Sequence, residues 1–176
     1  MDINGHNNLV EIYKNSIAII GAGISGLALG IILNKQNIKS VIFEKSSSVS
    51  EYGAGISISK NGQYVLSELE ILYNLKIISG NPQKAVFFSG SKKITSIESN
   101  VVTTSRKSLY DLLLNKYLDT GGKVCFNHEL INVNNSTKKV FFKNGSSYEV
   151  NHIAACDGIN SICRLKTLES SKPQYS

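Results

Sequence analysis

The chain has 176 residues, of which 41% are hydrophobic, so it can bury one substantial core and is typical of a single domain. The net charge of +6 comes from 17 lysines and two arginines that are spread along the chain without a dense block, and we therefore predict no nucleic-acid binding. The three cysteines have no C-x-x-C spacing, which indicates neither a disulfide framework nor a metal site and favours a reducing, cytoplasmic location.

The amino-terminal stretch gives no sign of a membrane or export signal. Residues 1–14 are polar and rich in asparagine, and we expect a disordered tail rather than a signal peptide. The uncharged stretch from Ser16 to Leu33 is shorter than the roughly 20 residues that a membrane span needs. It also holds four glycines at the spacing of a phosphate-binding loop, so we predict no transmembrane segment.

A glycine-rich motif follows the first apolar run of the chain. The run, residues 16–20, is typical of a strand buried on both faces of a parallel sheet, and the motif reads Gly21-Ala22-Gly23-Ile24-Ser25-Gly26. Gly21 allows a tight turn, Gly23 lets a pyrophosphate approach the backbone, and Gly26 lets the following helix pack closely. That helix is predicted over about residues 25–36, and its first turn presents free amides and the positive end of its dipole to phosphates.

An acid follows the motif at an informative distance. Glu44 ends the second predicted strand, residues 39–43, and lies 18 residues beyond Gly26. A carboxylate at this position can accept hydrogen bonds from ribose hydroxyls and would repel a 2′-phosphate, which favours FAD or NAD over NADP. Because the motif follows a strand, opens a helix and precedes this acid, we predict a dinucleotide-binding α/β fold.

The middle of the chain is more ambiguous. Residues 53–58, Gly-Ala-Gly-Ile-Ser-Ile, are either an ordinary flexible turn or a segment whose backbone passes close to a flat ligand. Apolar residues at helical spacing predict one helix over residues 61–75, with Pro82 following as a stop. Residues 84–88 and 92–97 are predicted to form two strands joined at Ser89-Gly90-Ser91.

The last third returns to regular patterns. A second helix is predicted over residues 108–118, with Ser108 as its N-cap and Gly121-Gly122 at its end. A strand at 123–126 and a meander of strands at 129–133, 138–143 and 146–150 follow, with Asn144-Gly145 as a hairpin turn. The apolar run 152–156 then re-enters the parallel sheet before Asp157-Gly158, a pair that taken alone is more typical of a turn than of a ligand site.

These segments occur in an order that resembles the amino-terminal part of the FAD-dependent aromatic hydroxylases, the class A flavoprotein monooxygenases with the p-hydroxybenzoate hydroxylase type of fold. The matching segments are residues 21–27, 44–45, 53–56, 105–106 with Leu109 and Leu113, and 157–164. The resemblance implies an α/β, Rossmann-like FAD-binding fold with a parallel sheet, a β-meander crossover and part of a substrate-domain sheet. It implies an FAD-binding domain over residues 15–166, in which about 82–104 contribute strands to an incomplete substrate domain, between tails at 1–14 and 167–176.

The resemblance also implies roles for individual residues. Gly21, Gly23 and Gly26, with Ala22, Ile24 and Ser25 between them, would hold the FAD pyrophosphate, and Glu44 would hold the adenosine ribose. Lys45 would lie near the adenine half or be a surface lysine, and the backbone of Gly55 would pass close to the cofactor. Arg106 would contact FAD from the start of its helix, and Asp157 and Gly158 would serve both FAD and the reduced nicotinamide. No catalytic acid or base and no metal ligand is implied.

In enzymes of this family NADH or NADPH reduces the FAD, and one oxygen atom is then transferred to a small organic substrate, which we expect to be aromatic. The chain shows no Gly-Asp motif of the kind that closes the flavin site, and it lacks most of the expected substrate sheet and the carboxyl-terminal helices. We therefore expect a truncated chain with an incomplete flavin pocket.

Three interpretations remain open. The chain is the FAD-binding part of a monooxygenase that is active only in a longer form or with the missing carboxyl-terminal half on another chain. It is alternatively an inactive, truncated remnant of such an enzyme. In the third interpretation it is a stand-alone or regulatory module that binds NAD or FAD, and tighter binding of NAD than of FAD would favour this.

Overall fold

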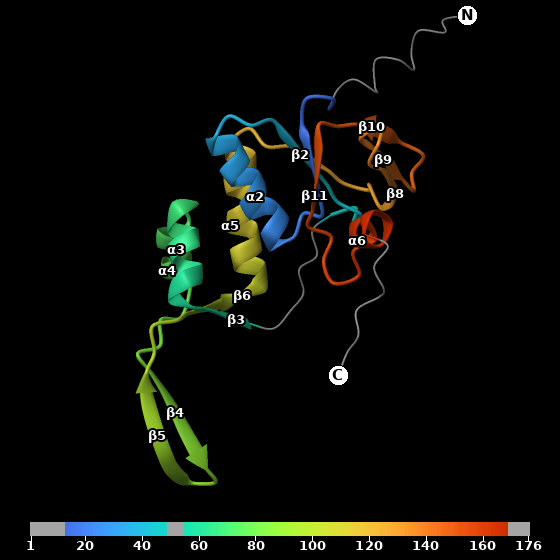
Figure 1. Ribbon diagram of the computed structural model, residues 1–176. Helices are drawn as coiled ribbons and strands as arrows, with labels where there is room; N and C mark the ends of the chain where they lie inside the picture. Colours follow the sequence, from blue (N-terminus) through green and yellow to red (C-terminus); the bar gives the residue numbers. More distant parts are fainter. Residues whose placement is uncertain (1–12, 49–54, 169–176) are drawn as a thin grey trace, which may run out of the picture. The chain divides into compact units, whose positions relative to one another are not determined.

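A computed structural model describes residues 13–48 and 55–168. The chain divides into two compact units. The first comprises residues 1–49 and 115–176, and the second comprises residues 50–114. Helix α5 (Arg106–Asp119) therefore begins in the second unit and ends in the first. Figure 1 shows the elements of both units in chain order.

The first unit is built on a four-stranded sheet, β11-β1-β2-β7, in which all neighbouring strands are parallel. Its strands are β1 (Ile17–Ile20), β2 (Ser40–Phe43), β7 (Val124–Cys125) and β11 (His152–Ala155). Ile20 lies opposite both Phe43 and Ala155, so β1, β2 and β11 end at the same edge. The predicted return of the chain to the parallel sheet is confirmed, and it places Cys156 beside Gly21.

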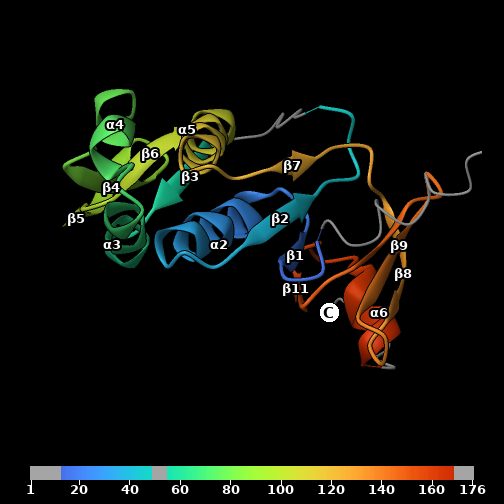
Figure 2. The same ribbon diagram turned by 90° about the horizontal axis from the view of Figure 1, so that it is seen from above.

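Both faces of this sheet are covered (Figures 1 and 2). Helix α2 (Ile24–Lys35) covers one face, where Ile19 and Ile42 are fully buried with Leu27 and Ile31 of the helix. Along β1 and β2 the alternate side chains point to the other face and join a second hydrophobic cluster, made of Tyr13, Ala18, Ile20, Val41, Phe43, Leu130, Val133, Val140, Phe142, Val150 and Cys163. Burial on both faces explains why β1 is wholly apolar in sequence and why β2 is apolar after Ser40.

The second cluster is closed by an antiparallel meander and a short helix. The meander has the order β10-β9-β8 and comprises β8 (Leu130–Asn134), β9 (Lys139–Phe142) and β10 (Ser147–Glu149). Helix α6 (Ile162–Thr167) packs against β8. The predicted meander is confirmed, as is the turn at Asn144-Gly145, where Gly145 has a φ of +85°.

Helix α2 packs closely against the last turn of α5 within the first unit. A Cβ atom at Gly30 would lie 2.6 Å from the ring of Tyr117, which is fully buried. Helix α5 ends as predicted, because Gly121 has a φ of +83° and donates to the Leu118 carbonyl, while Gly122 donates to the Tyr117 carbonyl. This is the glycine-dependent helix end that satisfies the last free carbonyls.

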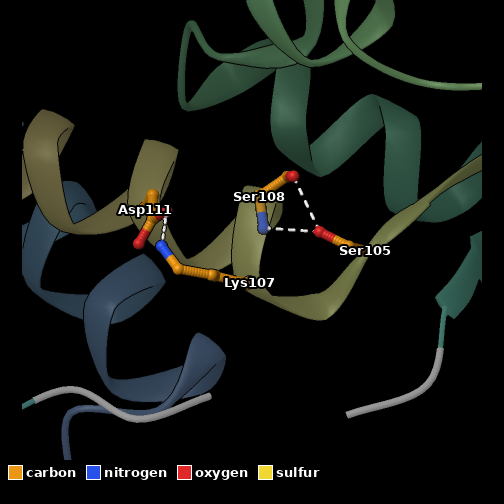
Figure 3. A network of polar contacts seen from close by, with 4 residues as sticks. All are labelled: Ser105, Lys107, Ser108 and Asp111. Carbon is orange, nitrogen blue, oxygen red and sulfur yellow. Dashed lines mark hydrogen bonds and ion pairs between the residues drawn. The ribbon is translucent and has the colours of Figure 1, made fainter. Parts of the chain in front are cut away.

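The start of α5 differs from the prediction. The helix begins at Arg106, and Ser105 rather than Ser108 is its N-cap, since the Ser105 Oγ accepts a hydrogen bond from the Ser108 amide at 2.9 Å (Figure 3). The two hydroxyls also lie 2.7 Å apart, and Lys107 pairs with Asp111 one turn further on. The prediction of Ser108 was wrong because strand β6 (Val102–Ser105) runs directly into the helix, which leaves Ser105 in the capping position.

The second unit begins with a strand pair that the sequence did not predict. Strand β3 (Gly55–Ile58) pairs antiparallel with β6 (Val102–Ser105), and Gly55 lies opposite Ser105. Residues 55–58 therefore form a strand rather than a flexible turn, because Ile58 is buried and the two isoleucines alternate with small residues. Gly53 and Ala54 lie outside the described residues.

The single helix predicted over residues 61–75 is two helices in the structure, α3 (Lys60–Glu68) and α4 (Leu72–Ile77). Between them Glu70 has a φ of +60°, and the Ile71 amide donates to the Leu66 carbonyl. Leu69, Ile71 and Leu75 are all buried. The prediction was wrong because the apolar spacing continues across this break, and glutamate gives no signal for a left-handed residue.

The predicted strands before and after Ser89-Gly90-Ser91 are confirmed as a hairpin of β4 (Lys84–Ser89) and β5 (Lys92–Glu98). The register shifts between Phe87 and Phe88. Every residue of β5 is exposed, and the large apolar side chains of the hairpin are at least 43% exposed.

Candidate functional site

A cavity of about 550 Å³ lies at the carboxyl edge of the parallel sheet and is lined entirely by residues of the first unit. Its walls come from the segments that follow β1, β2, β7 and β11, and this edge is where open α/β sheets bind ligands. The structure brings together at this cavity six residues that the sequence predicted for the site, namely Gly21, Gly23, Glu44, Lys45, Asp157 and Gly158.

The other predicted residues lie elsewhere. Ala22, Ile24, Ser25 and Gly26 complete the turn and the first turn of α2 beside the cavity. Gly55 and Arg106 belong to the second unit, where Gly55 begins β3 and Arg106 is the exposed first residue of α5.

The three motif glycines meet different surroundings. Gly21 has a φ of +102°, and a Cβ atom there would lie 2.5 Å from the Cys156 carbonyl oxygen. A Cβ atom at Gly26 would overlap the carbonyl oxygen of Gly21. Gly23 meets nothing within 4 Å, although it lines the cavity. Two of the glycines thus allow close packing of the chain on itself, and the third leaves space for a ligand.

The N-terminus of α2 is suited to an anion. Gly23 is the N-cap and accepts the first helical hydrogen bond, from the Leu27 amide at 3.0 Å. The first turn of α2 contains no acidic residue. Because the amides of a first helical turn have no carbonyl partner within the helix and the dipole is positive there, this end of α2 favours a phosphate.

Glu44 is half-buried in the wall between the glycine motif and the loop after β2. Its Oε2 accepts a hydrogen bond from the Ala22 amide at 2.8 Å, and its Oε1 accepts one from the Ser46 amide at 2.9 Å. Both carboxylate oxygens are therefore bonded to the chain itself. Lys45, the next residue, is exposed at the cavity.

Asp157 is bonded in a similar way. Its Oδ1 accepts a hydrogen bond from the Ser161 hydroxyl at 2.6 Å, and its Oδ2 accepts one from the Cys163 amide at 3.0 Å. Ser161 in turn caps α6 by accepting from the Arg164 amide. Gly158 has a φ of +78° and open space where a Cβ atom would stand. The carboxylate folds this loop so that the Gly158 backbone borders the cavity.

Sequence reasoning missed one wall of the cavity, which His128, Glu129, Leu130 and Ile131 form. This segment carries no motif, and its place is fixed by the hydrogen bond from the His128 amide to the Glu44 carbonyl at 2.8 Å. The signal that could have found it is its position directly after β7, because every segment that follows a parallel strand reaches the same edge of the sheet.

The His128 side chain anchors this wall to the aromatic core. Its Nδ1 lies 2.6 Å from the Phe126 carbonyl oxygen, and its Nε2 lies 3.4 Å from the Tyr148 hydroxyl. The ring centroid is 5.4 Å from that of Phe43 and 5.0 Å from that of Phe142. The His128 ring therefore packs against the second hydrophobic cluster, which gives this residue a structural role in the cavity wall.

The thiols near the site favour the neutral form. Burial raises the pKa of the Cys163 thiol to about 12, and the neighbouring Asp157 carboxylate adds to the rise. Burial, followed by the charge of Asp157, also raises the pKa of Cys156, which lines the cavity. A thiol is nucleophilic only as a thiolate, so neither group is activated for covalent chemistry.

The described residues offer neither a metal cluster nor a membrane-spanning helix. Within them no group of three histidine, cysteine, aspartate or glutamate side chains is arranged to hold a metal ion. No helix among them combines the length and the apolar character that crossing a membrane requires.

Comparison with known proteins identifies the family. The model of the FAD binding domain family matches residues 14–172. Monooxygenase 1 of Arabidopsis thaliana is 31% identical over 154 residues, which cover 83% of this chain and 38% of the relative. The 3-hydroxybenzoate 6-hydroxylase 1 of Aquipseudomonas alcaligenes is 26% identical, with 92% of this chain and 45% of the relative covered.

Solved structures agree on the fold. The 2-methyl-3-hydroxypyridine-5-carboxylic acid oxygenase superposes with a TM-score of 0.78 at 24% identity, covering 84% of this chain and 40% of that one. The p-nitrophenol 4-monooxygenase PnpA of Pseudomonas putida gives a TM-score of 0.79 at 16% identity, covering 86% and 43%. The chain thus spans about two fifths of the length of these proteins. With the glycine motif, the parallel sheet and the matched span taken together, this chain belongs to the FAD-binding domain family of the flavin-dependent monooxygenases.

Proposed function

We propose that this chain is the FAD-binding portion of an NADH- or NADPH-dependent monooxygenase that hydroxylates a small aromatic substrate. The observation that carries the proposal is the cavity at the carboxyl edge of the sheet, where the open side of Gly23 and the N-terminus of α2 meet. The names of the matched hydroxybenzoate and nitrophenol enzymes support the aromatic class.

The residues of the cavity fit FAD. The backbone of the 21–26 motif would hold the pyrophosphate, because Gly23 leaves room for it and the first turn of α2 offers free amides. Glu44 and Lys45 would border the adenosine half, and the Asp157-Gly158 loop would border the cofactor and the nicotinamide that reduces it. Arg106 and Gly55 are assigned to the same cofactor by the family resemblance alone.

The cofactor supplies the redox and oxygen chemistry, and the chain supplies binding, orientation and exclusion of water. The chain covers about two fifths of the length of its relatives. We propose that a carboxyl-terminal portion, on a longer form of the chain or on another chain, closes the flavin pocket and binds the substrate. Whether this portion lies on a longer form of the chain or on another chain, we assign no catalytic acid or base to the present residues.

An FAD titration of the purified 176-residue chain tests the proposal. Flavin fluorescence reports binding, NAD serves as competitor, and Gly23→Asp serves as the matched variant, since an aspartate would fill the open space and place a negative charge beside the phosphates.

We expect saturable binding of FAD that is lost in Gly23→Asp and that NAD displaces only weakly. A folded chain without FAD binding would contradict the proposal and favour an inactive remnant. Tighter binding of NAD than of FAD would contradict it in favour of a nicotinamide-binding module.

A further inference from the structure

Glu44 is a point at which four segments of the first unit meet. Its side chain accepts from the Ala22 amide at 2.8 Å and from the Ser46 amide at 2.9 Å. Its own amide donates to the Cys125 carbonyl at 2.9 Å, and its carbonyl accepts from the His128 amide at 2.8 Å. The residue thus connects the glycine turn, the loop after β2, the end of β7 and the wall of the cavity that follows β7.

We propose that Glu44 is a positioning residue of the cofactor site, whose ionised carboxylate fixes the Gly21–Gly23 turn and the loop after β2 before any ligand arrives. This inference rests on the proposed function, because it concerns how the same cavity is prepared for FAD. It goes beyond the ribose contact expected from the sequence, since the carboxylate acts through the protein backbone.

The chemistry of the two hydrogen bonds requires a carboxylate. Each oxygen faces an N–H donor, and an ionised carboxylate is a pure acceptor at both oxygens. A glutamine at this position has one acceptor oxygen, and its NH₂ group would face the other amide. Hydrogen bonds to a charged acceptor are also stronger than neutral ones, so the loss of one is expected to be measurable.

The turn is held from its other side by packing. Gly21 fits against the Cys156 carbonyl, with no room for a Cβ atom, and its amide donates to the Phe43 carbonyl at 2.8 Å. Glu44 supplies the remaining restraint, on Ala22. The first amides of α2 follow directly from this turn, so their direction depends on it.

A positioning role and a ribose contact predict different ligand dependence. A contact with ribose hydroxyls affects only ligands that carry those hydroxyls. A restraint on the turn affects every ligand whose pyrophosphate binds at the turn. The two roles can therefore be separated by changing the protein and the ligand together.

The experiment is a double-mutant cycle by calorimetry, with wild type and Glu44→Gln against ADP and 2′,3′-dideoxy-ADP. We expect Glu44→Gln to weaken binding of both ligands by the same factor, about tenfold, as for the loss of one charge-assisted hydrogen bond. A loss confined to ADP, with unchanged affinity for the dideoxy ligand, would overturn the proposal. Glu149→Gln, the same chemical change in β10, is the control and should leave both affinities within about twofold.

A second measurement needs neither a ligand nor a variant. In the ligand-free wild type, the Ala22 and Ser46 amides should both be protected from hydrogen exchange, because each donates to the Glu44 carboxylate. Exchange of either amide at the rate of an unprotected amide would overturn the proposal even if Glu44→Gln fails to fold. If the wild type binds neither ADP nor FAD, the proposed function fails, and hydrogen exchange still decides the role of Glu44.

Discussion

The three glycines of the motif are chemically identical, yet the structure separates their roles. Gly21 and Gly26 are required because the chain packs against itself, and Gly23 leaves space that nothing in the described chain fills within 4 Å. Substitution at the first two should therefore affect folding, whereas substitution at the third should affect binding. Two alanine variants test this separation.

We expect Gly26→Ala to lower the free energy of unfolding by about 2 kcal/mol, because its methyl group meets the Gly21 backbone and overpacking costs up to about 3 kcal/mol. The roughly 1 kcal/mol that alanine gains over glycine in a helix offsets only part of this cost. Gly23→Ala should change the unfolding free energy by less than about 1 kcal/mol and weaken FAD binding instead. Urea denaturation and fluorescence titration measure the two effects, and equal destabilisation by both variants would contradict the assignment.

Cys163 should respond to pH in a defined direction. Its pKa of about 12 in the folded chain lies above the ordinary value of 9.0, so the folded state holds the thiol proton more tightly than the unfolded state. The stability that this provides is fully present below pH 9 and is lost as the pH rises toward 12. Cys163→Ala should therefore flatten the alkaline fall of the unfolding free energy, measured by urea denaturation between pH 8 and 10.5. An unchanged slope would show that Cys163 does not contribute.

At the scale of elements, the parallel strands, α2 and the meander could be predicted from the sequence, because the spacing of their apolar residues matches the faces that they bury. The break between α3 and α4 could not, because Glu70 adopts a left-handed conformation that its residue type does not signal. Strand β6 was missed because Val102-Thr103-Thr104-Ser105 is short and polar, and its pairing with β3 is set by tertiary contact. The His128 wall of the cavity escaped prediction for the same reason: its position depends on a backbone bond to Glu44.

The corrected N-cap of α5 can be tested directly. Ser105→Ala removes the oxygen that accepts from the Ser108 amide and should destabilise the chain by about 1 kcal/mol. Ser108→Ala removes a hydroxyl from inside the first turn and should change stability by less than about 0.5 kcal/mol. Thermal unfolding of both variants compares the two serines under the same conditions. A larger loss for Ser108→Ala would restore the N-cap that the sequence predicted.

At the scale of the whole molecule, the two units differ in how they bury apolar side chains. In the first unit, both faces of the sheet are covered and the aromatic cluster is closed. In the second unit, the β4–β5 hairpin leaves Phe87 49% and Phe88 59% exposed, and Ile94 on the facing strand is 63% exposed. A two-stranded hairpin is marginal in water by itself, and monomeric proteins rarely leave large apolar patches open.

We therefore predict that the 176-residue chain self-associates through the hairpin. Changes in the hairpin should leave the cofactor cavity unaffected, because the lining of the cavity belongs entirely to the first unit. Replacing Phe87 and Phe88 together by serine removes the two aromatic side chains and should shift sedimentation velocity profiles from concentration-dependent association toward monomer. The affinity for FAD should stay within about twofold of the wild type, because surface changes away from a site have small effects. The matched control is Tyr64→Ser with Tyr73→Ser, which removes two exposed aromatics from α3 and α4. If the control pair reduces self-association equally, the association depends on exposed aromatic side chains in general and not on the hairpin.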